Sequence, residues 1–132
     1  MSYSNESYLI ELLQEAHLLD DAMLEDANHK KKGTESLLEG LLSLNLINSE
    51  SIAETLATNA GMEYVDLGKM DVDESVASHV PAESAVRFGI VPIAEGGGSL
   101  VVAVADPLDF DSLDSVRHVL SVEPEFVVAS DS

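Results

Sequence analysis

The spacing of apolar residues changes once along the chain, close to Gly61, and this change limits the folds that the sequence can adopt. Up to about residue 60 the apolar residues recur every three or four positions, which is typical of amphipathic helices. After Gly61 they alternate or form short runs between glycines and prolines, which is typical of strands and turns. We therefore expect an α+β protein with a helical subdomain over residues 1–60 and an α+β subdomain over residues 61–132.

The helical subdomain contains four amphipathic stretches separated by polar residues. The residues expected to face inward are Leu9, Leu12, Leu13 and Ala16 in the first stretch, Met23, Leu24 and Ala27 in the second, Leu37, Leu38, Leu41, Leu42 and Leu44 in the third, and Ile52, Ala53, Leu56 and Ala57 in the fourth. The expected helix starts are Asp20 or Asp21 for the second, Thr34 or Glu35 for the third, and Asn48 or Ser49 for the fourth.

The same segment has the marks of an internal duplication. Residues 8–27 align with residues 36–55 at an offset of 28 residues, which places Leu9, Leu13 and Leu18 on Leu37, Leu41 and Leu46. Each unit is a helix–turn–helix whose apolar face cannot be buried alone, so the two units should pack as a small four-helix layer. Any two leucine-rich amphipathic helices would also share some of this similarity.

The second subdomain is organised around a glycine-rich turn. Gly96, Gly97 and Gly98 separate two apolar runs, 90–94 and 100–105, and predict a β-hairpin. Pro92 has no amide hydrogen to donate, so its strand should lie at a sheet edge or be interrupted there. Further strands are expected at 62–67 and 125–129, and helical segments near 73–80, at 82–88, and from 110 to 120 with Phe110, Leu113, Val116 and Leu120 on one face. The predicted order is β-α-α-β-β-α-β, a sandwich with helices on one face of a small sheet.

The charge is strongly unbalanced, with 25 acidic residues against 6 lysines and arginines and a formal net charge of −19. Such a surface repels phosphate backbones and anionic lipids, which disfavours nucleic-acid binding and electrostatic membrane attachment. The chain has no cysteine, no apolar run long enough to cross a bilayer, and no cationic region typical of a secretory signal. We expect a soluble, acidic, cytoplasmic protein, and the acidity fits either a high-salt habitat or a basic partner.

No set of residues points to catalysis or to a metal site. The glycine run leads into a strand rather than into a helix N-terminus, and no GK[ST] motif follows, so a phosphate cradle is disfavoured. The four aspartates between residues 106 and 114 lack the register of a calcium-binding loop and are explained by helix capping. The histidines, His17, His29, His79 and His118, include no pair with helical metal-site spacing. We therefore expect no enzyme activity in this chain, no cofactor and no metal.

Two basic features stand out against the acidic background. Lys30-Lys31-Lys32 could contact a phosphate or an acidic partner, but a solvated loop between helices is favoured. Arg87 is one of two arginines and precedes a predicted strand, where pairing with a carboxylate is favoured.

A specific series of residues runs from position 80 to position 109: Val80-Pro81, Arg87, Pro92, and Val102-Ala103-Val104-Ala105-Asp106-Pro107-Leu108-Asp109. With the strand-like segments around it, this series resembles the N-terminal domain of type II secretion and type IV pilus assembly ATPases. The preceding leucine-rich helices fit the same family. The resemblance therefore extends over most of the chain.

The resemblance implies a role in a motor that powers assembly of pilus-like filaments. The ATPase core of such a motor follows this domain, and the present chain has no Walker A lysine. The family implies a non-catalytic docking or regulatory domain whose partners are that core and the cytoplasmic part of an inner-membrane platform protein. It would then be cytoplasmic and peripheral to the inner membrane. A stand-alone adaptor lacking the motor is an alternative.

A second alternative is sensing of cyclic di-GMP, which one branch of the family binds through two motifs of the form RLGxxLVxxGLI, each followed by a glutamine. The corresponding positions for arginine, first glycine, second glycine and glutamine hold Tyr8, Ile10, His17 and Lys31 in the first unit and Ser36, Leu38, Asn45 and Asn59 in the second. The leucines are retained, but a dianionic dinucleotide would lack its usual arginine. If the ligand bound, its expected contacts would be Leu9, Lys31, Leu37, Leu41, Asn45 and Asn59.

Overall fold

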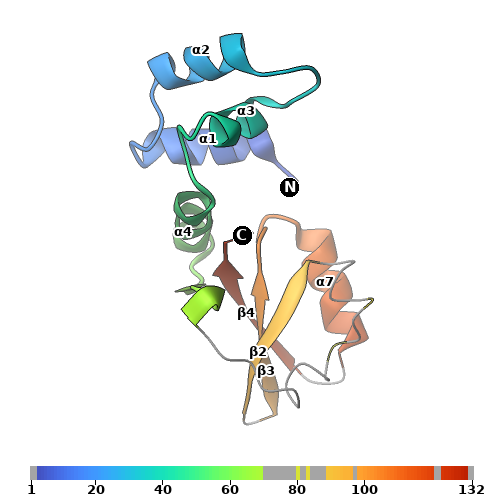
Figure 1. Cartoon of the computed structure of the whole chain (residues 1–132). Helices are drawn as coiled ribbons and strands as arrows, with labels where there is room; N and C mark the ends of the chain where they lie inside the picture. The colour runs from blue at the N-terminus through green and yellow to red at the C-terminus, as the bar shows by residue number, and fades with distance from the viewer. Residues whose placement is uncertain are drawn as a thin grey trace.

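Helices fill the first half of the chain and a small sheet fills much of the second (Figure 1). The computed structural model describes residues 3–69, 80, 83, 89–96, 98–120 and 123–130. The elements are α1 (Glu6–Glu15), α2 (Asp21–Lys30), α3 (Leu37–Ser43), α4 (Ser49–Ala60), β1 (Tyr64–Val65), the 3-10 helix η1 (Leu67–Lys69), β2 (Ile90–Gly96), β3 (Ser99–Val104), α7 (Phe110–Val119) and β4 (Glu123–Ala129). Apart from residues 80 and 83, the helical segments expected near 73–80 and at 82–88 fall outside the described residues, as do His79 and Arg87.

Side-chain caps set where the helices begin. The N-caps whose side chains accept a backbone hydrogen bond are Asn5, Asp20, Ser36, Asn48 and Asp109. The start expected for the third helix, at residue 34 or 35, is wrong by two to three residues. The physical reason is a capping box, in which the Ser36 hydroxyl accepts from the Glu39 amide and the Glu39 carboxylate accepts from the Ser36 amide.

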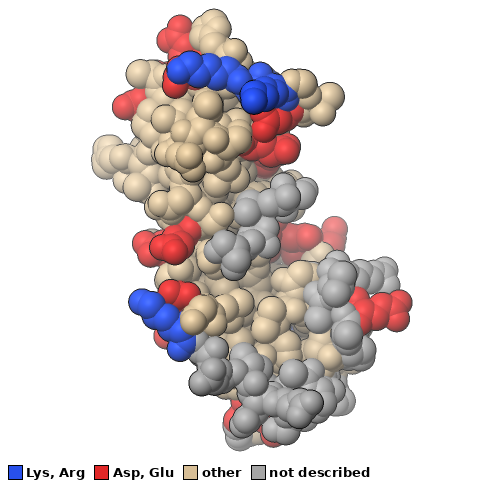
Figure 2. Space-filling view, in the orientation of Figure 1, with Lys and Arg blue, Asp and Glu red and all other residues tan. Residues whose placement is uncertain are grey.

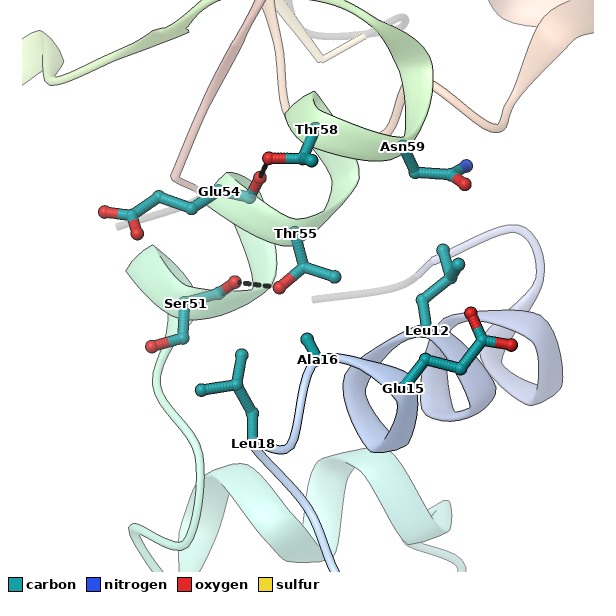
Figure 3. Close-up of a pocket in the computed structure, with 9 residues that line it drawn as sticks. All are labelled: Leu12, Glu15, Ala16, Leu18, Ser51, Glu54, Thr55, Thr58 and Asn59. Atoms are coloured by element: carbon teal, nitrogen blue, oxygen red, sulfur yellow. Dashed lines mark hydrogen bonds between the residues drawn. The ribbon is translucent and has the colours of Figure 1, made fainter.

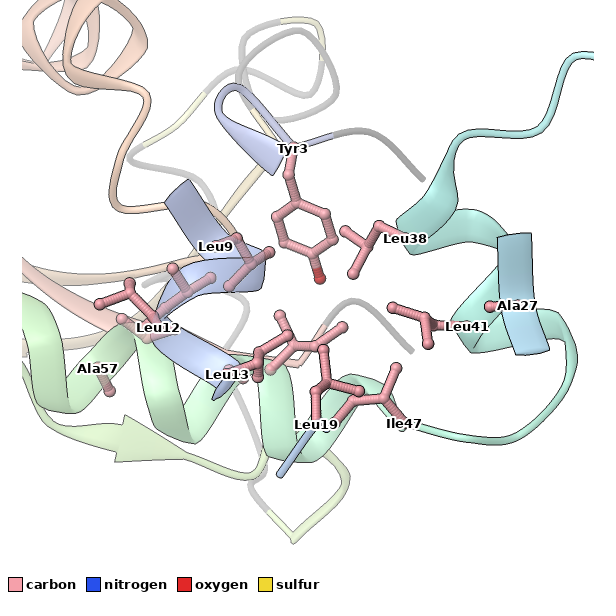
Figure 4. Close-up of a cluster of buried hydrophobic side chains, with 14 residues drawn as sticks. Tyr3, Leu9, Leu12, Leu13, Leu19, Ala27, Leu38, Leu41, Ile47 and Ala57 are labelled. Atoms are coloured by element: carbon pink, nitrogen blue, oxygen red, sulfur yellow. The ribbon is translucent and has the colours of Figure 1, made fainter. Parts of the chain in front are cut away.

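The four helices share one apolar core, as the sequence predicts (Figure 4). Its fully buried side chains include Leu9, Leu13, Leu38, Leu41, Ile52 and Leu56. The expectation that Ala16 faces inward is wrong, because Ala16 is the C-cap of α1 and lies exposed beyond the last helical turn. Helix α4 lies between the other three helices and the sheet (Figure 1).

The sheet has the strand order β1-β4-β3-β2, so the last strand of the chain is inserted between the first and the hairpin. β2 and β3 form the predicted antiparallel hairpin, and Gly98 has a φ of +82° in its turn. β4 pairs in parallel with both β3 and β1. The chain therefore crosses over from β3 to β4 through α7, the usual connection between parallel neighbours.

The edge position predicted for Pro92 is confirmed, because β2 is an outer strand. A register shift between Pro92 and Ala94 bulges the strand there. Ile90 and Ile93, three residues apart, point to opposite faces of the sheet and join different apolar clusters. The strand expected over 62–67 is shorter than predicted and comprises residues 64–65 alone. It ends because the Asp66 carboxylate accepts the Gly68 amide at 3.0 Å and starts η1.

One face of the sheet receives both α7 and the helical layer. Phe126 of β4 packs with Leu113 and Val116 of α7, while Val128, two residues further along the same strand, belongs to the core of the four helices. The prediction that Phe110 also faces inward is wrong, since the residue is 71% exposed. Phe110 is the first residue of α7, so it continues the apolar stripe of Leu113 and Val116 but lies beyond the part of the helix that packs on the sheet.

Candidate functional site

The two helix–turn–helix corners have the same backbone geometry. His17 and Asn45, 28 residues apart, are the two non-glycine residues of the described chain with a positive φ, at +61° and +58°. After each helix the same C-cap bond between residues five apart closes the turn, from the Leu18 amide to the Leu13 carbonyl and from the Leu46 amide to the Leu41 carbonyl. Both residues stand where the nucleotide-binding motif has its second glycine. Both corners thus adopt a left-handed conformation at the position of the motif's second glycine, without a glycine there.

The first glycine positions of the motif are filled by large side chains. Leu38 is 1% exposed and belongs to the helical core, and Ile10 packs against the same core. Glycine at these positions would leave room for a ligand to approach the backbone. Here that room is taken by the protein's own apolar packing.

The motif's arginine positions hold residues that are engaged within the protein. The Tyr8 hydroxyl donates to Asn59 Oδ1 at 3.3 Å, and the Ser36 hydroxyl donates to Glu6 Oε1 at 2.7 Å. The first bond is informative because Asn59 stands at the glutamine position of the other unit. The structure therefore brings together two polar motif positions that are 51 residues apart in the sequence.

The six conditional ligand contacts lie in different environments. Leu9 and Leu41 are fully buried in the helical core, and Leu37 is half-buried at its margin. Lys31 is exposed, and its Cβ lies only 3.1 Å from where a Cβ on Gly40 would be, so its stem packs close to α3. Asn45 and Asn59 are exposed. Of the six, Asn59 is the one that lines the two hollows described next.

A groove of about 450 Å³ runs between the end of α1 and the outer face of α4 (Figure 3). Its lining residues are Leu12, Glu15, Ala16, Leu18, Ser51, Glu54, Thr55, Thr58 and Asn59. We call it the α1–α4 groove. It exists because α1 ends at residue 15 and the chain turns away at His17, leaving the middle of α4 uncovered.

The α1–α4 groove is less polar than its composition indicates. The Thr55 hydroxyl donates to the Ser51 carbonyl at 2.8 Å and the Thr58 hydroxyl donates to the Glu54 carbonyl at 2.9 Å, as the dashed lines in Figure 3 show. Since both hydroxyls are used by the helix backbone, the methyl groups are left for contact with a ligand. The groove is therefore a poor site for a phosphate and a better one for apolar groups.

A second hollow of about 600 Å³ lies between the end of α4 and the start of α7. Its lining residues are Asn59, Ala60, Met62, Pro107, Leu108, Phe110, Asp111, Leu113, Asp114 and Arg117. We call it the α4–α7 hollow. The exposed ring of Phe110 borders it, and Asn59 belongs to both hollows. Sequence reasoning missed this site, because its lining comes from segments that are far apart in the sequence.

Acidic groups dominate the charge around both hollows. Glu15 and Glu54 border the α1–α4 groove, and Asp111 and Asp114 border the α4–α7 hollow. Among the described lining residues the one lysine or arginine is Arg117, whose guanidinium carbon lies 5.2 Å from the centre of the Phe126 ring. Lys30, Lys31 and Lys32 lie instead at the end of α2, the uppermost blue patch in Figure 2.

Within the described ranges, no cluster of histidines and carboxylates could hold a metal ion. Within the same ranges, no helix is both long and apolar enough to cross a membrane.

A family model described as the MshEN domain matches residues 60–132, more than half of the chain. The chain belongs to the MshEN domain family. The predicted resemblance to the N-terminal domain of type II secretion and type IV pilus ATPases is thereby confirmed.

Solved structures of MshEN relatives share the fold. The chain superposes on a structure of MshE with cdg, cyclic di-GMP, with a TM-score of 0.73 and 28% identity, covering 92% of this chain and 89% of that one. It superposes on the N-terminal domain of XpsE with a TM-score of 0.69 and 27% identity, covering 95% and 87%. These matches confirm the α+β fold, with its helical layer followed by a small mixed sheet.

Curated relatives of this MshEN chain include type IV pilus assembly ATPases. PilB of Thermus thermophilus is 35% identical over 118 residues, and PilB of Myxococcus xanthus is 28% identical over 123 residues. These alignments cover 85% and 92% of the chain but 13% and 22% of the two relatives. The chain is thus an accessory domain of the kind that such motors carry, and its 132 residues contain no ATPase core.

Proposed function

We propose that this MshEN domain is a docking domain, which couples a secretion or pilus ATPase to the cytoplasmic part of an inner-membrane platform protein. The observation that carries the proposal is the match of nearly the whole chain to N-terminal domains of such motors. The absence of an ATPase core in these 132 residues supports a non-catalytic role. In this role the domain works in the cytoplasm and reaches the inner membrane through its protein partner.

The chemistry of the surface supports a protein partner over a small anion. The α1–α4 groove and the α4–α7 hollow combine apolar linings with carboxylates. Carboxylates around an apolar surface set the orientation and the association rate of a basic protein. The same carboxylates repel phosphate groups.

Titration with the cytoplasmic domain of the cognate platform protein tests the proposal. We expect binding in the micromolar range at low salt, with an association rate that falls as salt is added. Absence of binding at tens of micromolar in low salt would contradict the docking role. Sequencing the gene beyond the codon for Ser132 separates a motor domain from a stand-alone adaptor. A P-loop further along the reading frame would assign the domain to a motor, and a stop codon would favour the adaptor.

Sensing of cyclic di-GMP is the second candidate, and the structure of the relative MshE with that ligand favours it. Against it stand the filled glycine positions and the engaged residues at the arginine positions. Calorimetry with cyclic di-GMP decides between the two. Micromolar affinity that falls in Lys31→Ala and Asn59→Ala, but not in the exposed control Lys69→Ala, would place sensing above docking.

A further inference from the structure

Three of the five large exposed apolar side chains of the described chain lie beside the two hollows. The five are Tyr8, Leu18, Val91, Phe110 and Val119. Leu18 lines the α1–α4 groove and Phe110 lines the α4–α7 hollow. The Tyr8 hydroxyl bonds to Asn59, where the two hollows meet. The two hollows share the lining residue Asn59, and we call the pair of them the trough, with Leu18 at one end and Phe110 at the other.

The trough has an apolar lining and an acidic rim. Leu12, Met62 and Leu113 contribute apolar surface along it, and the threonine hydroxyls of α4 are taken by backbone carbonyls. Four carboxylates line it, at Glu15, Glu54, Asp111 and Asp114. The guanidinium of Arg117 leans on the Phe126 ring. Among the described lining residues no other lysine or arginine offsets the carboxylates.

These properties select one kind of occupant. A second copy of the chain would place like-charged rims against each other, at −19 per copy, which is unfavourable. An anionic lipid surface is repelled by the same carboxylates. An elongated trough with apolar contacts along its length and acids on its rim suits an amphipathic helix that carries lysines or arginines beside its apolar face.

Resting on the docking function proposed above, we propose that the trough binds a basic amphipathic helix of the platform protein, with Phe110 as the central apolar anchor. A large aromatic ring that is 71% exposed in the free domain can bury most of its surface on binding. The carboxylates then pair with basic residues at the edge of the interface and control the rate of association.

Substitution of the anchor tests the proposal. Phe110 is the first residue of α7, where an acidic side chain is compatible with the helix dipole, so Phe110→Asp should fold. The matched control is Val119→Asp, because Val119 lies on the same helix, is 48% exposed and is not a lining residue of either hollow. Both variants add one negative charge. Far-ultraviolet circular dichroism and urea unfolding establish that each variant is folded.

Two probes are titrated into the wild type and both variants. One is the cytoplasmic domain of the cognate platform protein. The other is a synthetic amphipathic peptide of about 14 residues with leucines at helical spacing and lysines elsewhere, compared with its glutamate counterpart. We expect Phe110→Asp to weaken binding of the platform domain and of the lysine peptide at least tenfold. Val119→Asp should change either affinity less than twofold, and the glutamate peptide should not bind.

The outcomes separate this inference from the docking function. If the platform domain binds equally well to Phe110→Asp, the trough proposal is overturned and the docking function stands. If the lysine peptide binds through Phe110 but the platform domain does not bind, the docking function is overturned, and with it the assignment of the bound helix to the platform protein. Binding of neither probe, or of the glutamate peptide alone, overturns the trough proposal.

Discussion

The backbone amide of Ser4 donates a 2.7 Å hydrogen bond to Asp106 Oδ2, across 102 residues of sequence. The other carboxylate oxygen of Asp106 accepts the Leu108 amide at 3.1 Å and fixes the turn that leads into α7. Tyr3, the neighbour of Ser4, is buried in the core of the four helices. Asp106 therefore joins the start of the chain to the loop between β3 and α7, beside the α4–α7 hollow.

We expect Asp106→Ala to lower the free energy of unfolding by about 1–2 kcal/mol, because it removes the acceptor of two backbone amides. Urea unfolding followed by circular dichroism measures the change. Glu125→Ala is the matched control, since Glu125 is an exposed carboxylate on β4. Equal unfolding midpoints for Asp106→Ala and the wild type would show that the contact contributes nothing to stability.

A second prediction concerns His17 and Asn45, the residues with a positive φ at the two helix–turn–helix corners. His17→Gly should raise the free energy of unfolding by about 1 kcal/mol, because glycine adopts a positive φ without steric cost. Asn45→Gly should raise it by only a few tenths, because asparagine tolerates this conformation.

The control for this pair is His29→Gly, an exposed histidine inside α2, where glycine should cost roughly 0.5–1 kcal/mol. Urea midpoints of the three variants rank the effects. A loss of stability in His17→Gly would mean that the His17 side chain makes contacts worth more than the relief of backbone strain.

Local signals in the sequence predicted much of this fold. Helix caps and hairpin turns depend on residues within a few positions of one another. This is why the caps at Asp20 and Asn48 and the hairpin formed by β2 and β3 were predicted. The inward faces of α3 and α4 followed from helical spacing. Errors arose at element ends, as at Ala16 and Phe110, where a periodic pattern continues beyond the turn that buries it.

The candidate site was less predictable, because it is made by contacts between distant segments. The trough forms where α1 stops short along α4 and where α7 starts beside the end of α4. The bond between Tyr8 and Asn59 spans 51 residues, and insertion of β4 between β1 and β3 places α7 near α4. Spacing within one helix carries no information on such contacts.

Val128 gives a third prediction, because it connects the two halves of the fold. It lies in the central strand β4, is fully buried, and packs in the core of the four helices. We expect Val128→Ala to lower the free energy of unfolding by about 2 kcal/mol while unfolding stays a single transition. Circular dichroism at 222 nm and the fluorescence of Tyr64, measured in a Tyr3→Phe, Tyr8→Phe background where it is the one tyrosine left, should then report the same midpoint.

Val102→Ala is the comparison, since Val102 is equally buried in the neighbouring strand but packs with α7 and not with the four helices. A similar loss of stability is expected, again in one transition. If Val128→Ala instead split the curve into a helical and a sheet transition, the two halves would be independent folding units.

The last prediction concerns the effect of salt on stability and follows from the net charge of −19. Carboxylates on one small domain repel each other, and salt shortens the screening length from about 10 Å at 0.1 M to about 3 Å at 1 M. We expect Tm to rise by roughly 5 °C between 0.1 M and 2 M KCl, which corresponds to about 1 kcal/mol for a domain of this size. Differential scanning calorimetry measures the change.

A charge-depleted variant separates screening from general salt effects on apolar surface. Replacing Glu11, Glu15, Glu123 and Glu125 by glutamine removes four exposed carboxylates and brings the net charge from −19 to −15. If repulsion is the cause, the variant should be more stable than the wild type at 0.1 M KCl and should gain less from added salt. Equal gains in both proteins would assign the effect to apolar burial, and a Tm that falls with salt would mean that the acidic surface stabilises the fold.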